Sequence, residues 1–261
     1  MPLTITFIRH GESLDNIGMV YAGWKDARLS PLGERQAAAL GVYFSTTSPT
    51  SFSHIYSSDL QRAHQTASAV QQATKGPPVI TNTDLRERHW GIAEGKPYAG
   101  KVRKESEKLE DLIAKGVYPI LMGRDEKFPE GESFEDLHVR AVKAIREYLV
   151  KHLADEVDAN IAIASHGLCI GELVSALVKM DPEADQSRNF TGLRNTGAYG
   201  PTVYLRGILR TTLSLAQGSC LHQGANAVMW NALAVLLIID DISLPMGSPR
   251  TLKISLHCTL K

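Results

Sequence analysis

Two short stretches place histidine at the end of an apolar run. Arg9 and His10 follow LTITFI, and His166 follows NIAIAS. Charged groups at the end of a buried strand are unfavourable unless an anion meets them. The planar fork of arginine matches phosphate oxygens, and a neutral imidazole can attack phosphorus and hold the phosphoryl group. The pattern therefore predicts phosphoryl chemistry.

Each of these side chains fits a separate part of that chemistry. His10 is the candidate nucleophile, and its attacking nitrogen is unprotonated only if the other ring nitrogen donates to a fixed acceptor, typically a backbone carbonyl. We expect His166 to be protonated when phosphate arrives and to stabilise the transferring oxygens. Arg9 and Arg62 are the candidate phosphoryl clamp. No metal is expected, since the step depends on positioning and charge and the sequence has no metal-ligand spacing.

A departing alkoxide needs a proton, and Glu87 in LRERHWGIAEG is the candidate donor. Its neighbours Arg86 and Arg88 favour the ionised carboxylate, whereas a bound phosphate favours the protonated acid because like charges repel. Glu87 can then act as general acid, and afterwards as base for water. Glu94 is the alternative donor, and Glu132 is another acid nearby.

Alternating strand and helix patterns are expected to position these residues. The predicted strands are residues 3–8, 53–58, 77–82 and 160–165. The predicted helices are residues 29–44, 58–73, 109–116, 133–153 and 168–180. This alternation favours an α/β fold, in which a mainly parallel sheet is covered on both faces. Ligands of such sheets collect at the carboxyl ends of the strands, so His10 and His166 are expected to share one pocket.

The composition argues against several functional classes. Of the 261 residues, 43% are hydrophobic and 21% are charged, as in ordinary soluble globular proteins. Lys plus Arg and Asp plus Glu both number 28, so no overall field favours nucleic acid or an anionic membrane. The three cysteines are widely spaced without a CxxC motif, which argues against a disulfide framework and a zinc site. With no signal-peptide pattern or bilayer-length apolar run, we expect a cytoplasmic protein.

Five motifs then occur in one order between residue 3 and about residue 200. They are RHGES, with Asn16 six residues after the histidine, SSDLQRAHQTA, LRERHWGIAEG, PEGESFEDL and ASHG. This set resembles the signature motifs of the histidine phosphatase superfamily, the phosphoglycerate-mutase-like proteins. The resemblance implies a three-layer α/β/α sandwich, a small phosphorylated substrate and no cofactor.

The resemblance also implies roles for individual residues. It makes His10 the phosphorylated nucleophile and Glu87 the proton donor, within a phosphate pocket formed by Arg9, Arg62 and His166. Asn16 is implied as a further phosphate ligand. Additional candidates for phosphate or substrate binding are Gly23, Gly167 and Trp90, although Trp90 could equally be a core residue.

Within this superfamily, mutases and phosphatases differ in how they hold the far end of the substrate. GWKDARLSPLG and ERHWG are similar to cofactor-dependent phosphoglycerate mutases, which also carry an arginine pair in the middle insertion. This chain has a lone Arg124 there and looks more like TIGAR-like fructose-2,6-bisphosphatases and broad-specificity phosphatases. A mutase must also exclude water, so fewer clamps favour hydrolysis.

We therefore predict a metal-independent phosphatase of small phosphorylated metabolites, such as fructose-2,6-bisphosphate. A cofactor-dependent phosphoglycerate mutase and an inactive protein that binds phosphorylated ligands remain alternatives. The sequence leaves the oligomeric state open.

Two regions lie outside the motifs. Residues 96–130, here called the insertion, are expected to set substrate specificity, and the basic stretch Lys101–Lys108 within them is predicted to be a solvated helix face. Residues 1–208 are predicted to form the histidine phosphatase domain. Residues 209–261 have few charges and no clear periodicity, and are predicted to be an atypical C-terminal extension of uncertain structure.

Overall fold

The computed structural model describes residues 3–47, 49–154, 159–180, 209–216 and 234–241. They contain a six-stranded sheet with the strand order β3-β2-β4-β1-β6-β5. The strands are β1 (Leu3–Arg9), β2 (His54–Ser57), β3 (Val79–Thr81), β4 (Ala159–Ser165), β5 (Leu209–Ala216) and β6 (Ala234–Asp241). The α-helices are α1 (Leu14–Ile17), α2 (Pro31–Val42), α3 (Gln61–Thr74), α4 (Leu109–Ala114), α5 (Phe134–Ala154) and α6 (Gly167–Lys179).

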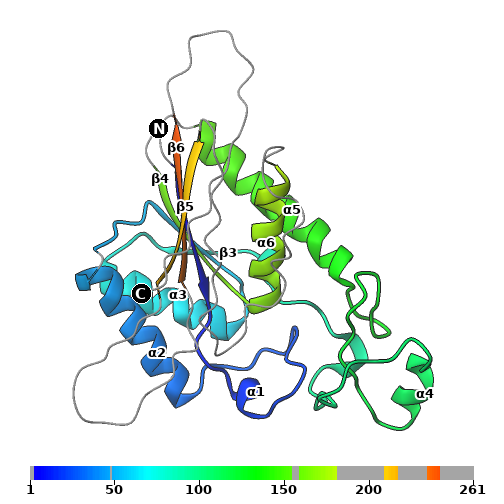
Figure 1. Ribbon diagram of the computed structural model, residues 1–261. Coiled ribbons are helices and arrows are strands. Elements are labelled where there is room, and N and C mark those ends of the chain that lie inside the picture. The colour runs from blue at the N-terminus through cyan, green and yellow to red at the C-terminus, as the bar shows by residue number, and fades with distance from the viewer. Residues whose placement is uncertain (1–2, 48, 155–158, 181–208, 217–233, 242–261) are drawn as a thin grey trace.

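The sheet is mainly parallel and is covered on both faces. Strands β3, β2, β4 and β1 run parallel, and β6 and β5 continue the sheet in antiparallel pairings. Helices α2 and α3 lie on one side of the sheet, and α5 and α6 lie on the other (Figure 1). The predicted three-layer α/β fold is confirmed.

Alternate side chains of β4 enter the two cores. Ile161 and Ile163 join the cluster beneath α5 and α6, whereas Ala162 and Ala164 join the cluster beneath α2 and α3. This alternation follows from the two-residue period of a strand. All four side chains are buried, which is why the segment is a continuous apolar run in the sequence.

The long helices begin where the sequence places their capping residues. The Ser30 hydroxyl accepts the N–H of Gly33 at 3.0 Å at the start of α2. Before α5, the Ser133 hydroxyl accepts the N–H of Asp136 at 3.0 Å, and the Asp136 carboxylate accepts the N–H of Ser133 at 2.9 Å. This reciprocal pair fixes the start of α5.

The stretch Lys101–Lys108 is not a helix, contrary to the sequence prediction. It forms turns that precede α4. Lys101 forms an ion pair with Glu107, and Arg103 forms one with Glu126. The charges therefore pair across turns of the insertion rather than along one helical face.

Two segments of the predicted C-terminal extension are described, and both are strands of the same sheet. Strand β6 pairs with β1, and β5 pairs with β6. Residues 217–233 and 242–261 lie outside the described residues, and the predicted boundary after residue 208 stays a prediction. Among the helices that the structure describes, none combines the length and the apolar character needed to cross a bilayer.

The loop after β1 lies directly against the first turn of α2. A Cβ added to Gly11 would lie 2.6 Å from the carbonyl oxygen of Gly33, and one added to Gly33 would lie 2.0 Å from that of Glu12. Only glycine allows the two backbones to come this close. The position of the loop that carries His10 therefore depends on both glycines.

We expect Gly33→Ala to lower the free energy of unfolding by about 1–3 kcal/mol, because the added methyl overlaps a backbone carbonyl that cannot easily move. Gly18→Ala is the control, since its nearest atoms lie 3.7 Å from an added Cβ. This control should change stability by less than about 0.5 kcal/mol. Denaturant unfolding measures both, and equal stability of the two variants would contradict the close approach.

Candidate active site

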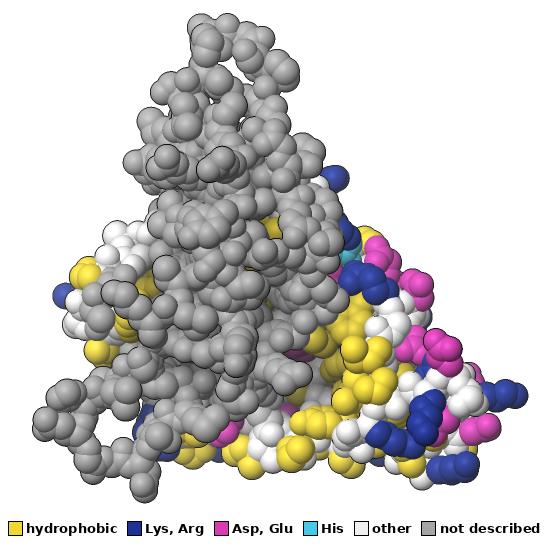
Figure 2. Space-filling model, viewed as in Figure 1, with side chains coloured by type: hydrophobic (Ala, Val, Ile, Leu, Met, Phe, Trp, Pro, Cys, Tyr) yellow, Lys and Arg dark blue, Asp and Glu magenta, His cyan; other side chains and the backbone are white. Residues whose placement is uncertain are grey.

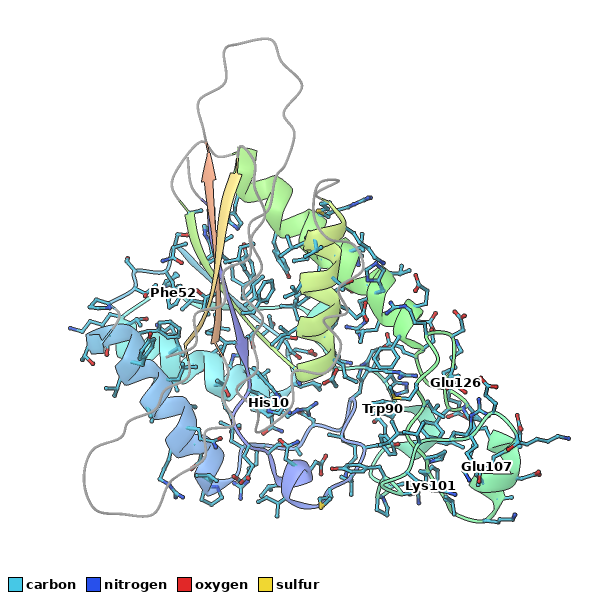
Figure 3. The ribbon with its side chains drawn as sticks, viewed as in Figure 1. His10, Phe52, Trp90, Lys101, Glu107 and Glu126 are labelled. Carbon is cyan, nitrogen blue, oxygen red and sulfur yellow. The ribbon has the colours of Figure 1, made fainter. Side chains whose placement is uncertain are left out.

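His10 and His166 lie at the carboxyl ends of adjacent parallel strands. The β1–β4 register pairs Arg9 with Ser165, and the His10 N–H donates to the Ser165 carbonyl at 3.0 Å. The two imidazole rings are buried, with centroids 5.0 Å apart. Figure 3 shows His10 at the end of β1. The structure thus brings the two histidines together as the sequence predicts.

The ring of His10 is held in one tautomer. Its Nδ1 lies 2.6 Å from the carbonyl oxygen of Gly11, and a carbonyl only accepts, so Nδ1 carries the proton. Burial lowers the pKa of His10 well below its usual value, and the nearby Arg62 and Arg9 lower it further. His10 is therefore neutral, with an unprotonated Nε2, as a nucleophile requires.

His166 contacts a serine that the sequence argument did not identify. Its Nε2 lies 2.9 Å from the hydroxyl of Ser58, whose N–H donates to the Ala164 carbonyl at 2.9 Å. The Nδ1 of His166 is buried and has no hydrogen-bond partner among the described residues. Burial lowers the pKa of His166 well below its usual value, and Arg62 adds to this effect.

Arg62 reaches from the first turn of α3 to the loop after α1. Its guanidinium donates to the carbonyls of Gly23 at 2.7 Å and Lys25 at 2.8 Å. Gly23 has a φ of +49°, and a Cβ there would lie 2.2 Å from a carboxylate oxygen of Glu94. The Nε of Arg62 is buried without a hydrogen-bond partner among the residues described. The Nε–H group of Arg62 can therefore donate a hydrogen bond to a ligand.

Arg9 is placed beside the N-terminus of α6. A Cβ added to Gly167 would lie 3.5 Å from the Cζ of Arg9, so the guanidinium lies close against this glycine. Burial lowers the pKa of both Arg9 and Arg62, and Glu87 is the carboxylate that most strongly raises it again. The two cations and Glu87 therefore share one electrostatic environment.

The carboxylate of Glu87 caps helix α6. One oxygen accepts the N–H of Leu168 at 3.2 Å, and the other accepts the N–H groups of Cys169 at 3.2 Å and Arg88 at 2.9 Å. An acidic group at a helix N-terminus is stabilised by the amide dipoles there. Glu87 is thus fixed at the same end of the sheet as His166, which directly precedes α6.

The other two candidate acids hold loops together. Glu94 accepts the N–H of Trp24 at 2.7 Å. Glu132 accepts two donors from the side chain of Arg140, at 3.0 and 2.8 Å, and the N–H of His89 at 2.9 Å. Glu87 differs from them in its surroundings, because it is the carboxylate that most strongly affects the pKa of both Arg9 and Arg62, and it is therefore the best-placed candidate donor.

Asn16 and Trp90 have structural contacts of their own. The Asn16 side-chain oxygen accepts the N–H of Ser13 at 3.0 Å, so its amide group is oriented. The Trp90 ring lies 4.7 Å from Tyr21, and the Arg88 guanidinium lies 4.5 Å from the centre of the Trp90 ring. Trp90 packs against the apolar cluster of the insertion (Figure 3), in line with the core interpretation.

Sequence reasoning missed the residues that position the site through distant contacts. Ser58 contacts His166, and the Thr66 hydroxyl accepts the N–H of Gly11 at 3.1 Å. Arg140 donates to the carbonyl of Glu87 at 3.1 Å. Of these three residues, only Ser58 could have been found from the sequence, because it lies at the end of a predicted strand, where site residues collect. Among the described residues, no group of three or more His, Cys, Asp or Glu is arranged to hold a metal ion.

Comparison with known proteins identifies the class to which this fold and site belong. Residues 5–199 match the model of the histidine phosphatase superfamily (branch 1), and the chain belongs to that superfamily.

Individual relatives include both mutases and phosphatases. A 2,3-bisphosphoglycerate-dependent phosphoglycerate mutase of Cytophaga hutchinsonii is 30% identical over 70% of this chain and 80% of its own. A broad-specificity phosphatase of Saccharomyces cerevisiae is 32% identical over 63% of this chain and 66% of its own. The structure of a mycobacterial glucosyl-3-phosphoglycerate phosphatase in complex with inorganic phosphate has a TM-score of 0.52 and 27% identity. That match covers 67% of this chain and 79% of the other.

The buried histidines predict a loss of stability in acid. Unfolded histidines bind protons near their usual pKa of about 6.5, whereas folded His10 and His166 do so only at much lower pH. Below about pH 6.5 the unfolded state therefore binds more protons, and the free energy of unfolding falls by up to about 1.4 kcal/mol per pH unit for each histidine.

Replacing one of the two histidines should remove its share of this dependence. We expect His10→Gln to have a shallower fall in stability than the wild type between about pH 6.5 and the lower pKa of the folded state. Denaturant unfolding at a series of pH values measures the two slopes. Identical slopes would mean that His10 is not held neutral by the fold.

Proposed function

We propose that this protein is a metal-independent phosphatase that hydrolyses small phosphorylated metabolites, sugar phosphates such as fructose-2,6-bisphosphate among them. The supporting observation is the group formed by the buried Arg62, the partly buried Arg9 and two buried, neutral histidines. Two of its polar atoms, Arg62 Nε and His166 Nδ1, have no partner among the described residues. A phosphoryl group supplies both the negative charge and the acceptor oxygens that these groups require. We also propose a cytoplasmic location, because the three widely spaced cysteines favour a reducing compartment.

The first chemical step is transfer of the phosphoryl group to His10. The lone pair of Nε2 attacks phosphorus, and the bond between phosphorus and the ester oxygen breaks. Arg9 and Arg62 neutralise the oxygens of the transferring group, and His166 takes up a proton in the field of the bound dianion. Glu87, protonated when it faces that dianion, gives its proton to the departing alkoxide.

The second step returns His10 to its starting state. Glu87, now a carboxylate, takes a proton from water as the water oxygen attacks the phosphorus of phosphohistidine. The phosphorus–nitrogen bond breaks, and inorganic phosphate leaves. The Nδ1 contact to the Gly11 carbonyl keeps the ring in the same tautomer through both steps.

The remaining candidates have supporting roles in this proposal. Asn16, whose side-chain oxygen is already engaged, donates from its amide nitrogen to a phosphate oxygen. Gly23 provides the carbonyl that orients Arg62, and Gly167 lies beside the guanidinium of Arg9. Trp90, which packs against the cluster that contains Tyr21 and Phe128, has a packing role in this proposal.

The ion pairs of the insertion favour a phosphatase over a mutase. The Arg124 guanidinium is bound by both oxygens of Glu172, each at 3.1 Å, and by Glu135 at 3.2 Å. Lys101 and Arg103 also pair with carboxylates. Positive and negative side chains are interspersed over this part of the surface (lower right of Figure 2). A mutase needs cations there to grip the far end of phosphoglycerate, and these three are already neutralised.

A phosphoglycerate mutase is the second candidate, because several relatives carry that name, including the Cytophaga hutchinsonii protein. Isomerisation of 3-phosphoglycerate, primed by 2,3-bisphosphoglycerate and faster than hydrolysis, would establish this candidate over the first.

The phosphatase is tested with the full-length protein in EDTA. We expect hydrolysis of 4-nitrophenyl phosphate and of at least one sugar phosphate, and a loss of at least about 1,000-fold in kcat for His10→Ala. Acid quenching of the wild type should trap a phosphohistidine that the variant lacks. Phosphate release and mass spectrometry provide the two measurements.

Gly18→Ala, which lies outside the site, is the control for protein handling and should retain wild-type rates. Hydrolysis that survives His10→Ala would overturn the proposed chemistry. Tight binding of inorganic phosphate without any turnover would instead support the inactive, phosphate-binding alternative.

A further inference from the structure

The loop that carries Glu87 is held from helix α5 by Arg140. One terminal nitrogen of its guanidinium donates to the carbonyls of Asp84 and Arg86, each at 2.8 Å. The other donates to the carbonyl of Glu87 at 3.1 Å. One side chain thus binds three carbonyl groups within four consecutive residues, one of them belonging to the candidate proton donor.

A second contact fixes the guanidinium itself. Its Nε and one terminal nitrogen donate to the two oxygens of Glu132, at 3.0 and 2.8 Å. The same carboxylate accepts the N–H of His89 at 2.9 Å. Arg140 and Glu132 therefore hold the loop on both sides of Glu87.

The positions of both partners follow from the start of α5. Glu132 directly precedes Ser133, whose hydroxyl and N–H form the reciprocal cap with Asp136. Arg140 lies two turns further along the same helix. Because helix α5 packs against the sheet, it gives the pair a rigid support.

We propose that Arg140, oriented by Glu132, is a positioning residue for proton transfer by Glu87. This inference rests on the proposed phosphatase function and concerns the same site. The planar fork of arginine serves several acceptors in fixed directions, whereas the single ammonium group of lysine cannot reproduce them. When the fork is lost, the loop shifts and the Glu87 carboxyl leaves its place at the N-terminus of α6. A general acid contributes only from hydrogen-bond distance of the leaving oxygen.

Leaving-group dependence separates this role from a merely structural one. An alkyl phosphate needs a proton on its leaving oxygen, whereas 2,4-dinitrophenyl phosphate releases a stable anion. We expect Arg140→Lys to lower kcat/KM for a sugar phosphate by at least about 10-fold. The loss for 2,4-dinitrophenyl phosphate should be under about 3-fold, because kcat/KM reports formation of phosphohistidine, which does not need Glu87 when the leaving group is good.

Arg124→Lys is the matched control. Arg124 also binds both oxygens of a buried carboxylate, that of Glu172, and within the described part of the chain its side-chain hydrogen bonds go to Glu172 and Glu135 rather than to the loop that carries Glu87. Because Glu172 and Glu135 already bind its guanidinium, Arg124 is not assigned a contact with the alcohol portion, and this variant should affect the two substrates equally. Vanadate binding, measured by calorimetry, should be the same in both variants and the wild type if Arg9, Arg62 and the two histidines are undisturbed.

Amide hydrogen exchange provides a readout that is independent of activity. Residues 85–89 should exchange faster in Arg140→Lys than in the wild type, and should be unchanged in Arg124→Lys. Equal losses for the two substrates, no loss for either, or unchanged exchange in Arg140→Lys would overturn the positioning role.

Failure of the proposed function has a different signature, because the wild type would then show no hydrolysis that depends on His10. Exchange at residues 85–89 would still decide in that case whether Arg140 holds the loop.

Discussion

Positive charge buried at the carboxyl ends of β1 and β4 is the constraint on which the site depends. Arg62 is buried and Arg9 is partly buried, and burial lowers the pKa of each. Protonation of His10 and His166 would add two positive charges beside the arginines at a high cost in free energy, and both imidazoles are accordingly neutral. Burial keeps His10 unprotonated, and the field of Arg62 and Arg9 adds to this effect while it also attracts a dianion. Binding and nucleophilicity therefore share an electrostatic contribution.

Backbone groups provide much of the positioning around this charge. The Gly11 carbonyl sets the tautomer of His10, the Gly23 and Lys25 carbonyls direct Arg62, and amides of α6 hold Glu87. Such groups cannot change rotamer, and they are anchored by strands and helices of a packed core. The geometry is thus fixed before a ligand arrives, which lowers the reorganisation needed during the reaction.

The parts predicted from the sequence are those with a local signal. Apolar runs ending in His10 and His166 predicted two strand ends, and the parallel order of the strands brought them together. The start of α5 at Ser133 was also predicted from a local signal, since Ser133 and Asp136 are only three residues apart. By contrast, the carbonyl contacts of Arg140 join residues more than 50 positions apart, and no spacing in the sequence marks them.

The predictions that were wrong or missing also concern contacts between residues that are not neighbours in the sequence. The charges of Lys101–Lys108 have a spacing compatible with a helix face, but two of them pair with carboxylates across turns. Strand β6 was not predicted because its sequence, AVLLIIDD, lacks the alternation of a half-exposed strand; it lies inside the sheet, between β1 and β5, where a continuous apolar run is tolerated. Strand β5 was also not predicted, although its sequence, LRTTLSLA, alternates leucine with polar residues over part of its length.

A third apolar cluster, separate from the two cores beside the sheet, joins the insertion to neighbouring loops. Its buried members are Leu121 and Phe128 of the insertion, together with Tyr21 and Ala93 from outside it. Arg124 joins the insertion to Glu172 of α6. Arg88 lies between the rings of Trp90 and Phe134, at 4.5 and 4.3 Å.

Because packing energy depends mainly on contacts within each cluster, side chains of the insertion can be exchanged with little effect on the strand ends that carry the histidines. This separation gives a physical reason why one phosphoryl-transfer site can be combined with different substrates. In the proposed phosphatase, the strand ends thus carry the chemistry, and the fit of the alcohol portion is assigned to the insertion, whose side chains pack mainly in a separate cluster.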